Sequence, residues 1–325
     1  MRQIDKNTFF DTTQKFDFVP FTQSEGWWTY HSVKDENRFA FFVDSLEKPM
    51  IACMGHIKKS FGLKMLQIES ECLFDKKNID SKKIREFYKE ITQTGFDIIE
   101  VNSSLPYNAL YEIGIREAGY LRPVGMFSTS LSSWIYLQQE IHYNRNWERN
   151  IKKSEKYDLE LEIITQANEK DCNDFCEIYN LMSNRKMINK LFSQQVSGLF
   201  IDKNFQLLFV KGNNERIAAI IIYFNKKGAF ADGVFAGSTG KALTIHATFF
   251  MYNAMFQYLK GLNCEIYDMA RLAPSTHSKQ SVFLFKNGVK GDYLLYCGEW
   301  SWYRKRIYRP LMYFVKKYLF KRVEI

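Results

Sequence analysis

Apolar and polar positions alternate in blocks along this chain, and the blocks predict strands joined by tight turns. Residues 39–43 are apolar, a polar turn follows at 44–49, and residues 50–54 are apolar again. The same arrangement recurs at residues 205–210 and 217–224. Short apolar runs on either side of a polar turn are typical of β-hairpins. We therefore predict two hairpins, one in each half of the chain.

Helical periodicity follows each hairpin. Apolar side chains three and four residues apart predict helices over residues 81–94 and 241–260, and a glycine follows each of them. Strand-like runs come next, and then a shorter helical pattern that also ends at a glycine, at residues 107–118 and 276–287. The chain therefore repeats one unit, which indicates tandem domains.

Each repeat has the order hairpin, helix, strand, helix and returning strand. This is the element order of a GNAT acyltransferase fold. The expected fold class is α/β (α+β), with two tandem GNAT-like domains in which helices flank a mixed sheet. We place the first domain at residues 1–145 and the second at 146–302, and we expect residues 303–325 to pack back on the first. No sustained heptad pattern predicts a coiled-coil arm.

The segment 147–156 lies at the junction of the two repeats and predicts a helix with one packing face and one basic face. Trp147, Ile151 and Ser154 fall at helical spacing. The residues that could face an anion are Arg149, Asn150, Lys152, Lys153 and Lys156. The segment is therefore either a solvated helix between domains or an anion-binding element.

The net charge of +9 is unevenly distributed. Residues 303–322 contain eight Lys or Arg, six aromatic residues and no acid. Such a segment can lie on an anionic membrane surface or contact nucleic-acid phosphates. Alternatively, it is a helix that docks by its aromatic face and keeps its lysines in water.

We expect a cytoplasmic protein that is at most peripheral at the inner face of the plasma membrane through residues 303–322, and we expect it to be a monomer. The six cysteines show no zinc-site spacing, so we interpret them as reduced thiols and expect neither a metal nor a cofactor. The N-terminus lacks the apolar region of a signal peptide. The longest apolar run, 217–224, is too short to span a bilayer.

Several colinear motifs resemble the FemABX family of peptidoglycan interpeptide-bridge aminoacyltransferases. Residues 20–27 resemble its Gln-Ser-x-x-Trp opening, and residues 127–156 resemble its Leu-Ser … Arg-Tyr-Asn-Ile-Arg block. Later matches are Gly237-Ser238 to its Gly-x-Ser turn, Tyr267-Asp268 to its Tyr-Asp-Phe strand end, and Phe285-Lys286 with Gly288 to its Phe-Lys-x-x-Phe-Gly motif. The order holds over nearly the whole chain and resembles the compact, armless members.

This resemblance implies a transferase of peptidoglycan biosynthesis and cell-wall biogenesis. It would move an amino acid from aminoacyl-tRNA to the amine of a precursor stem peptide, through a tetrahedral intermediate. Its partners would be aminoacyl-tRNA and a nucleotide- or lipid-linked precursor. The amino acid and the form of the acceptor stay open.

Aminoacyl transfer needs a fixed positive donor for the oxyanion, and Lys286 after Phe285 is the candidate. The alternative is an exposed lysine on the polar face of its helix. The attacking amine must also lose a proton, for which Asp268 and Asp232 are candidate bases. Either carboxylate could instead be structural, and the ester or the substrate's own carboxylate could take the proton.

A nucleotide-linked acceptor brings phosphates, which Arg149, Lys152 and Arg185 could clamp. The other substrate-binding candidates are Asn150, Gly237, Ser238, Phe285 and His31. His31 lies near the position of a family lysine, and residues 67–71 and 269–271 also depart from the family pattern. These departures leave the acceptor open. His246 falls within an apolar helical pattern and is interpreted as a core residue.

A second hypothesis keeps the fold and changes the donor. Residues 237–242, Gly-Ser-Thr-Gly-Lys-Ala, partly match the loop on which GNAT enzymes hold the pyrophosphate of acyl-CoA, although the leading Arg or Gln is missing. The chain would then be an acyl-CoA-dependent N-acyltransferase acting on an amino sugar or another cell-envelope polysaccharide precursor. A third hypothesis is a non-enzymatic protein that binds membrane or envelope enzymes through its basic end.

Overall fold

The computed structural model describes residues 1–33, 35, 38–60, 62–76, 78–125, 129–186, 188–274 and 280–319. Residues 127–128 of the FemABX-like block and the start of the predicted helix 276–287 lie outside them. The chain forms two compact units, each built from separate stretches. The first comprises Met1–Gln23, Asp35–Ser132 and Leu294–Ile325, and the second comprises Ser24–Lys34 and Ser133–Tyr293.

The first unit contains a mixed sheet with the strand order β1-β2-β3-β4-β6-β13. Its strands are β1 (Arg2–Ile4), β2 (Phe39–Val43), β3 (Ile51–Ser60), β4 (Leu63–Glu69), β6 (Ile98–Pro106) and β13 (Asp292–Tyr303), and β5 (Cys72–Leu73) pairs with β3. All neighbours are antiparallel except β4 and β6. Because parallel strands need a crossover, helix α3 (Ser81–Ile91) connects this pair.

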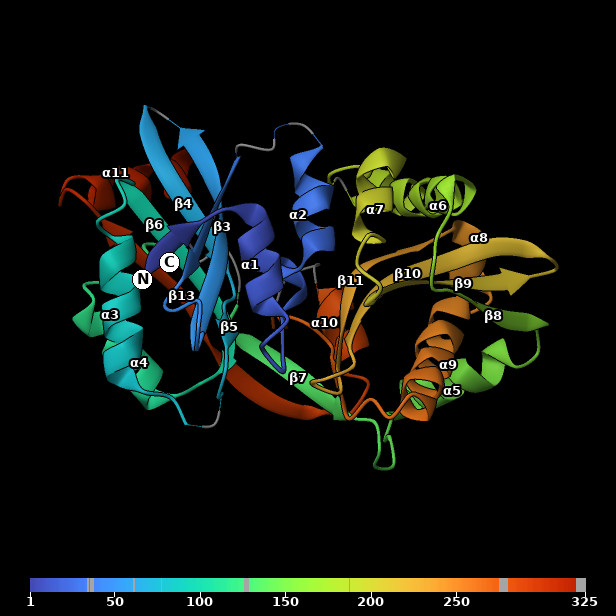
Figure 1. Cartoon of the computed structure of the whole chain (residues 1–325). Helices are drawn as coiled ribbons and strands as arrows, with labels where there is room; N and C mark the ends of the chain where they lie inside the picture. Colours follow the sequence, from blue (N-terminus) through green and yellow to red (C-terminus); the bar gives the residue numbers. More distant parts are fainter. Residues whose placement is uncertain are drawn as a thin grey trace. The chain divides into compact units, whose positions relative to one another are not determined.

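Helices α3 and α4 (Ala109–Glu117) lie side by side against one face of this sheet (Figure 1). Their buried side chains, among them Tyr88 and Tyr111, form one core with Leu66, Ile99 and Trp300 of the strands. The remaining helices of this unit are α1 (Lys6–Thr13), the 3₁₀ turn η1 (Phe21–Gln23), α11 (Tyr308–Phe314) and the π-helical turn η3 (Val315–Leu319).

Gln23 of the opening motif is a structural residue in the first unit. Its Nε2 donates to the carbonyl oxygens of Met54 (3.1 Å), Glu69 (2.9 Å) and Ser70 (3.1 Å). Its Oε1 accepts from the Met54 amide at 2.5 Å. The side chain is fully buried. It therefore satisfies backbone groups of β3, of the last residue of β4 and of the residue after it, as a neighbouring strand would.

The second unit contains a mixed sheet with the order β7-β12-β11-β10-β9-β8. Its strands are β7 (Leu131–Tyr136), β8 (Leu159–Ile164), β9 (Phe205–Gly212), β10 (Glu215–Asn225), β11 (Phe230–Ser238) and β12 (Ile266–Asp268). Its helices are α2 (Glu25–Ser32), α5 (Arg145–Ser154), α6 (Glu169–Lys186), α7 (Ser193–Leu199), α8 (Gly240–Thr244), α9 (Ala247–Gly261) and α10 (Gln280–Lys286). Strands β11 and β12 are the parallel pair, and α8 and α9 make their crossover.

The helix predicted over residues 241–260 is two helices. His246 has a left-handed backbone (φ 59°) between α8 and α9, so the chain turns there before α9 begins. The apolar periodicity continues through this break, because both helices pack on the same core around Ala242, Ala247 and Met251. A periodic pattern therefore gave no sign of the interruption.

The predicted fold class is confirmed, since both units are mixed sheets flanked by helices in the expected order. The boundaries differ from the predicted division at 145/146. Strand β7, which ends the first repeat, pairs with β12, whereas β13, which ends the second repeat, pairs with β6. Helix α2 also belongs to the second unit. Apolar periodicity identifies a strand but carries no information about which sheet it joins.

Candidate active site

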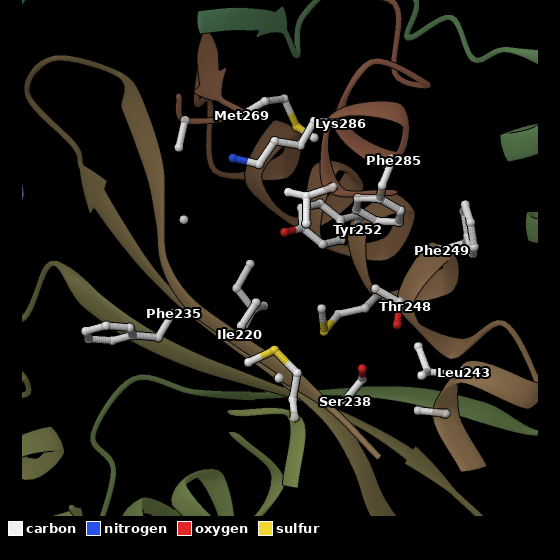
Figure 2. Close-up of a pocket in the computed structure, with 18 of the residues that line it drawn as sticks. Ile220, Phe235, Ser238, Leu243, Thr248, Phe249, Tyr252, Met269, Phe285 and Lys286 are labelled. Carbon is white, nitrogen blue, oxygen red and sulfur yellow. The ribbon is translucent and has the colours of Figure 1, made fainter. Parts of the chain in front are cut away.

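A cavity of ≈660 Å³ lies in the second unit (Figure 2). Its walls come from the second half of β11, from α8 and the start of α9, from the end of β12, and from α10. Most of the lining is apolar, and the polar side chains include Lys286, Asp268, Tyr252 and Thr248. Apolar pockets with a few convergent polar groups are typical ligand sites.

Lys286 is the last residue of α10, and its side chain lines this cavity. Its Nζ donates to the carbonyl oxygen of Arg271 at 3.3 Å. Burial lowers the pKa of Lys286 below its usual value of 10.5, and the nearby charge of Asp268 opposes this shift. Figure 2 shows the amine directed into the pocket, near Met269. Lys286 is therefore a half-buried cation that lines the cavity, not an exposed surface lysine.

Trp147 holds the helix that carries Lys286. Its Nε1 donates to the carbonyl oxygen of Phe285 at 2.8 Å, and the Phe285 ring lies 4.8 Å from the indole. The indole is fully buried and stacks on Tyr143 at 5.4 Å. Gly288 approaches it so closely that no side chain would fit there. The packing face of α5 therefore fixes the end of α10.

Asp268 is 6% exposed and ends β12, where its Oδ1 accepts from the amide of Ala270 at 2.8 Å. Asp232 pairs with Asp268 in the parallel β11–β12 register. Asp232 is half-buried, but it does not belong to the described lining of the cavity, whereas Asp268 does. The structure thus brings Asp268 beside Lys286 and leaves Asp232 one strand away.

The basic residues of α5 lie at a different place. Arg149 and Lys152 line an open groove of ≈420 Å³ with four other α5-region residues: Arg145, Glu148, Lys153 and Lys156. Neither is among the described residues that line the Lys286 cavity. Asn150 is buried on the helix and donates to Asn146 at 3.3 Å. The predicted phosphate clamp is therefore not assembled around the cavity.

Arg185, Gly237 and Ser238 do meet at the cavity wall. The guanidinium of Arg185 donates to the carbonyl oxygen of Ser238 at 2.5 Å. Gly237 passes against the backbone of Tyr179, so a side chain there would collide with it. These residues therefore fix the path of the chain at the end of β11.

Two backbone amides of the loop from Gly237 to Ala242 already donate hydrogen bonds to other groups of the protein. The Thr239 amide donates to Ile217 O at 2.9 Å, and the Ala242 amide donates to the Thr239 hydroxyl at 3.2 Å. Lys241 pairs with Glu215 at 2.5 Å. Two amides that an acyl-CoA pyrophosphate would need are therefore occupied.

His31 belongs to an aromatic cluster on α2. Its ring lies 4.7 Å from that of Trp27 and 4.8 Å from that of Tyr30. Phe235 joins both of these rings, at 6.2 Å from Trp27 and 5.5 Å from Tyr30, and also lines the cavity. Through Trp27 and Tyr30, His31 is thus connected to Phe235 of the cavity wall.

Sequence reasoning missed three polar residues of the cavity. His246 lines it at the helix break, and burial together with the charges of Lys153 and Arg149 lowers its pKa. Tyr252 directs its hydroxyl into the cavity on the same side as the Lys286 amine (Figure 2), and burial raises its pKa to about 12. The Thr248 hydroxyl is buried and has no hydrogen-bond partner among the described residues.

Within the described part of the chain, no group of three or more His, Cys, Asp or Glu side chains is arranged to hold a metal ion. All six cysteines are buried free thiols.

No family model and no curated protein matches the sequence. Solved structures do match. FemX has a TM-score of 0.74 at 9% identity, covering 96% of this chain and 100% of that one. L-PGS from Bacillus licheniformis has a TM-score of 0.65 at 12% identity, covering 99% and 98%. The C-terminal domain of a putative lysylphosphatidylglycerol synthetase from Agrobacterium fabrum has a TM-score of 0.60 at 11% identity, and the match covers 85% of this chain and 87% of that one. The chain therefore has the fold of FemX, as the motifs predicted.

Proposed function

We propose that this protein is an aminoacyltransferase that moves an amino acid from aminoacyl-tRNA to the amine of a peptidoglycan-precursor stem peptide. The observation that carries the proposal is the half-buried Lys286, which lines a mostly apolar cavity together with Asp268, at the position of the FemABX-like Phe-Lys motif. The fold, which FemX shares over nearly its whole length, supports the same function.

The reaction joins the acceptor nitrogen to the ester carbonyl carbon. This attack places a negative charge on the carbonyl oxygen, and the Lys286 ammonium would stabilise it in a mostly apolar cavity. Collapse of the intermediate then breaks the bond to the ribose oxygen, which leaves with the proton that the amine gives up. The Tyr252 hydroxyl, directed to the same side of the cavity, is a second candidate donor.

Asp268 suits a supporting role better than that of a general base. Its charge favours the ammonium form of Lys286, so it helps to keep the oxyanion donor protonated. A free lysine-like amine at pH 7 needs about 4–5 kcal/mol to become neutral, and desolvation in an apolar cavity lowers that cost. The leaving ribose oxygen can accept the proton in the end, so the proposal requires no protein base.

Two features favour RNA over acyl-CoA as the donor. The loop after β11 has already used the Thr239 and Ala242 amides, which weakens a pyrophosphate site there. The basic residues of α5 line an open groove of their own, and the charges of Lys153 and Arg149 contribute to the lowered pKa of His246 at the cavity wall. Such a surface suits the phosphate backbone of a polynucleotide, whose binding weakens as salt rises.

The test is a donor and acceptor competition with the full-length protein. Aminoacyl-tRNA and acyl-CoA, each radiolabelled in the transferred group, are offered with a nucleotide-linked precursor, a lipid-linked precursor or phosphatidylglycerol. We expect label from aminoacyl-tRNA in a stem peptide and none with Lys286→Met protein. Transfer from acyl-CoA, or label in phosphatidylglycerol alone, would refute the proposal.

A further inference from the structure

The C-terminal helix of the first unit exposes a stripe of large apolar side chains. Ile307 is 65% exposed, Leu311 40%, Phe314 56% and Tyr318 62%. They are spaced by four, three and four residues along α11 and η3, so they follow one face of the helix. Contiguous apolar surface of this kind marks an interaction site more often than single exposed residues do.

The opposite face fixes this helix to its own unit. Met312 is buried with Met65 of β4 and Ile98 of β6. Lys316 is 1% exposed, and its Nζ lies 3.0 Å from the Glu100 carboxylate and 3.3 Å from the Gly125 carbonyl oxygen. A buried, paired lysine in mid-helix sets the rotation of the helix about its axis. The outward direction of the stripe is therefore built into the fold.

The surroundings of the stripe are basic. Lys305 and Arg306 are exposed just before α11 and form no ion pair with any described residue, and Arg309 lies within its first turn. The sequence contains no acid between residues 303 and 322. The complementary surface must therefore be both apolar and negatively charged.

We propose that this stripe, Ile307, Leu311, Phe314 and Tyr318 with its basic flank, rests on an anionic lipid bilayer. An interfacial helix places its apolar face at the acyl boundary and its cations at the headgroups. A second copy of the chain fits poorly, because two identical basic faces repel each other. Nucleic acid would pair with the cations but would leave the four apolar side chains in water.

This inference goes beyond the proposed function, because it concerns neither the donor nor the reaction. None of the described helices is long and apolar enough to cross a membrane. The contact would hold the protein at the membrane surface through unit-one residues alone, and it can be measured without any substrate.

The test is co-sedimentation of the full-length protein with vesicles of phosphatidylcholine, alone or mixed with phosphatidylglycerol. One variant is Leu311→Ser with Phe314→Ser, and another is Lys305→Glu with Arg306→Glu. The matched control is Phe192→Ser with Ile201→Ser, which are 60% and 61% exposed in the second unit. Circular dichroism and thermal unfolding check that each variant folds.

We expect binding to mixed vesicles, little binding to phosphatidylcholine alone, and release at high salt. Each stripe or charge variant should bind mixed vesicles roughly tenfold more weakly or worse, since the first removes two side chains from the acyl boundary and the second reverses two charges at the headgroups. The control should bind like the native protein. Failure of the native protein to bind mixed vesicles would overturn the proposal, as would stripe variants that fold and bind normally. Self-association in lipid-free solution that the stripe variants abolish would assign the face to a second copy instead.

Discussion

Replacing Lys286 with methionine removes the positive charge and nearly preserves the length of the side chain. The cavity around Lys286 is mostly apolar, and its amine donates a hydrogen bond to the Arg271 carbonyl oxygen at 3.3 Å. Removing one preorganised oxyanion donor typically costs a factor of about 10²–10³ in kcat, or ~2.7–4 kcal/mol. We expect Lys286→Met to lose turnover within this range.

The same substitution should leave the fold intact. Burial disfavours the ammonium form of Lys286, as the lowered pKa indicates. A methionine of similar length avoids that desolvation cost and packs against the apolar wall. The free energy of unfolding should therefore stay unchanged or rise, so a loss of activity could not be attributed to unfolding.

The assay is single-turnover aminoacyl transfer at saturating donor, alongside the affinity for a non-hydrolysable aminoacyl-RNA. Lys290→Met, at an exposed lysine four residues further on, is the matched control. The expected pattern is a slow chemical step with unchanged donor affinity in Lys286→Met and normal behaviour in the control. A native-like rate in folded Lys286→Met protein would show that the oxyanion is stabilised by another group.

The pH dependence of kcat should show an alkaline limb below pH 10.5, because the active ammonium of Lys286 exists only below its lowered pKa and is lost as the pH rises through it. Lys286→Arg should move that limb upward, since a guanidinium stays charged; an unmoved limb would assign it to another group. Gly288→Ala should lower the free energy of unfolding by about 1–3 kcal/mol in denaturant titrations, because the added methyl group meets the indole of Trp147. An unchanged unfolding midpoint would mean that the indole can shift. Gln23→Leu should lower the free energy of unfolding, measured by denaturant titration, by about 1–3 kcal/mol for each backbone group of Met54 that it leaves buried and unpaired. Native-like stability of this variant would show that water replaces the Gln23 amide.

The sequence predicted the elements well where short-range periodicity decides them. The strand predicted at 39–43 is β2, and the helix predicted at 81–94 contains α3. Phe285 and Lys286 are both found at the cavity. Such features depend on neighbours a few residues apart, which a sequence displays directly.

The sequence did not predict what depends on distant parts of the chain. The basic face of α5 gave no sign that it would lie outside the cavity, because helical spacing relates Arg149 to Trp147 but not to β11. The contribution of that segment is instead Trp147, which holds Phe285 from 138 residues away. Tyr252 was missed for a similar reason, since only the tertiary fold aims its hydroxyl into the cavity.

The last strand of each repeat pairs with a strand of the other repeat, and this has a consequence for biosynthesis. The sheet of the first unit lacks β13 until about residue 303 has been translated, although most of that unit precedes residue 132. Helix α2, by contrast, is made early and must await α7: Gly26 of α2 packs against Leu199 of α7, and Gly198 of α7 packs against Thr29 and Tyr30 of α2. We therefore expect that neither unit can complete its fold on the ribosome before most of the chain has been translated. Cutting the gene at codon 145 should yield two fragments that stay incomplete alone and recover native structure only when they are expressed together.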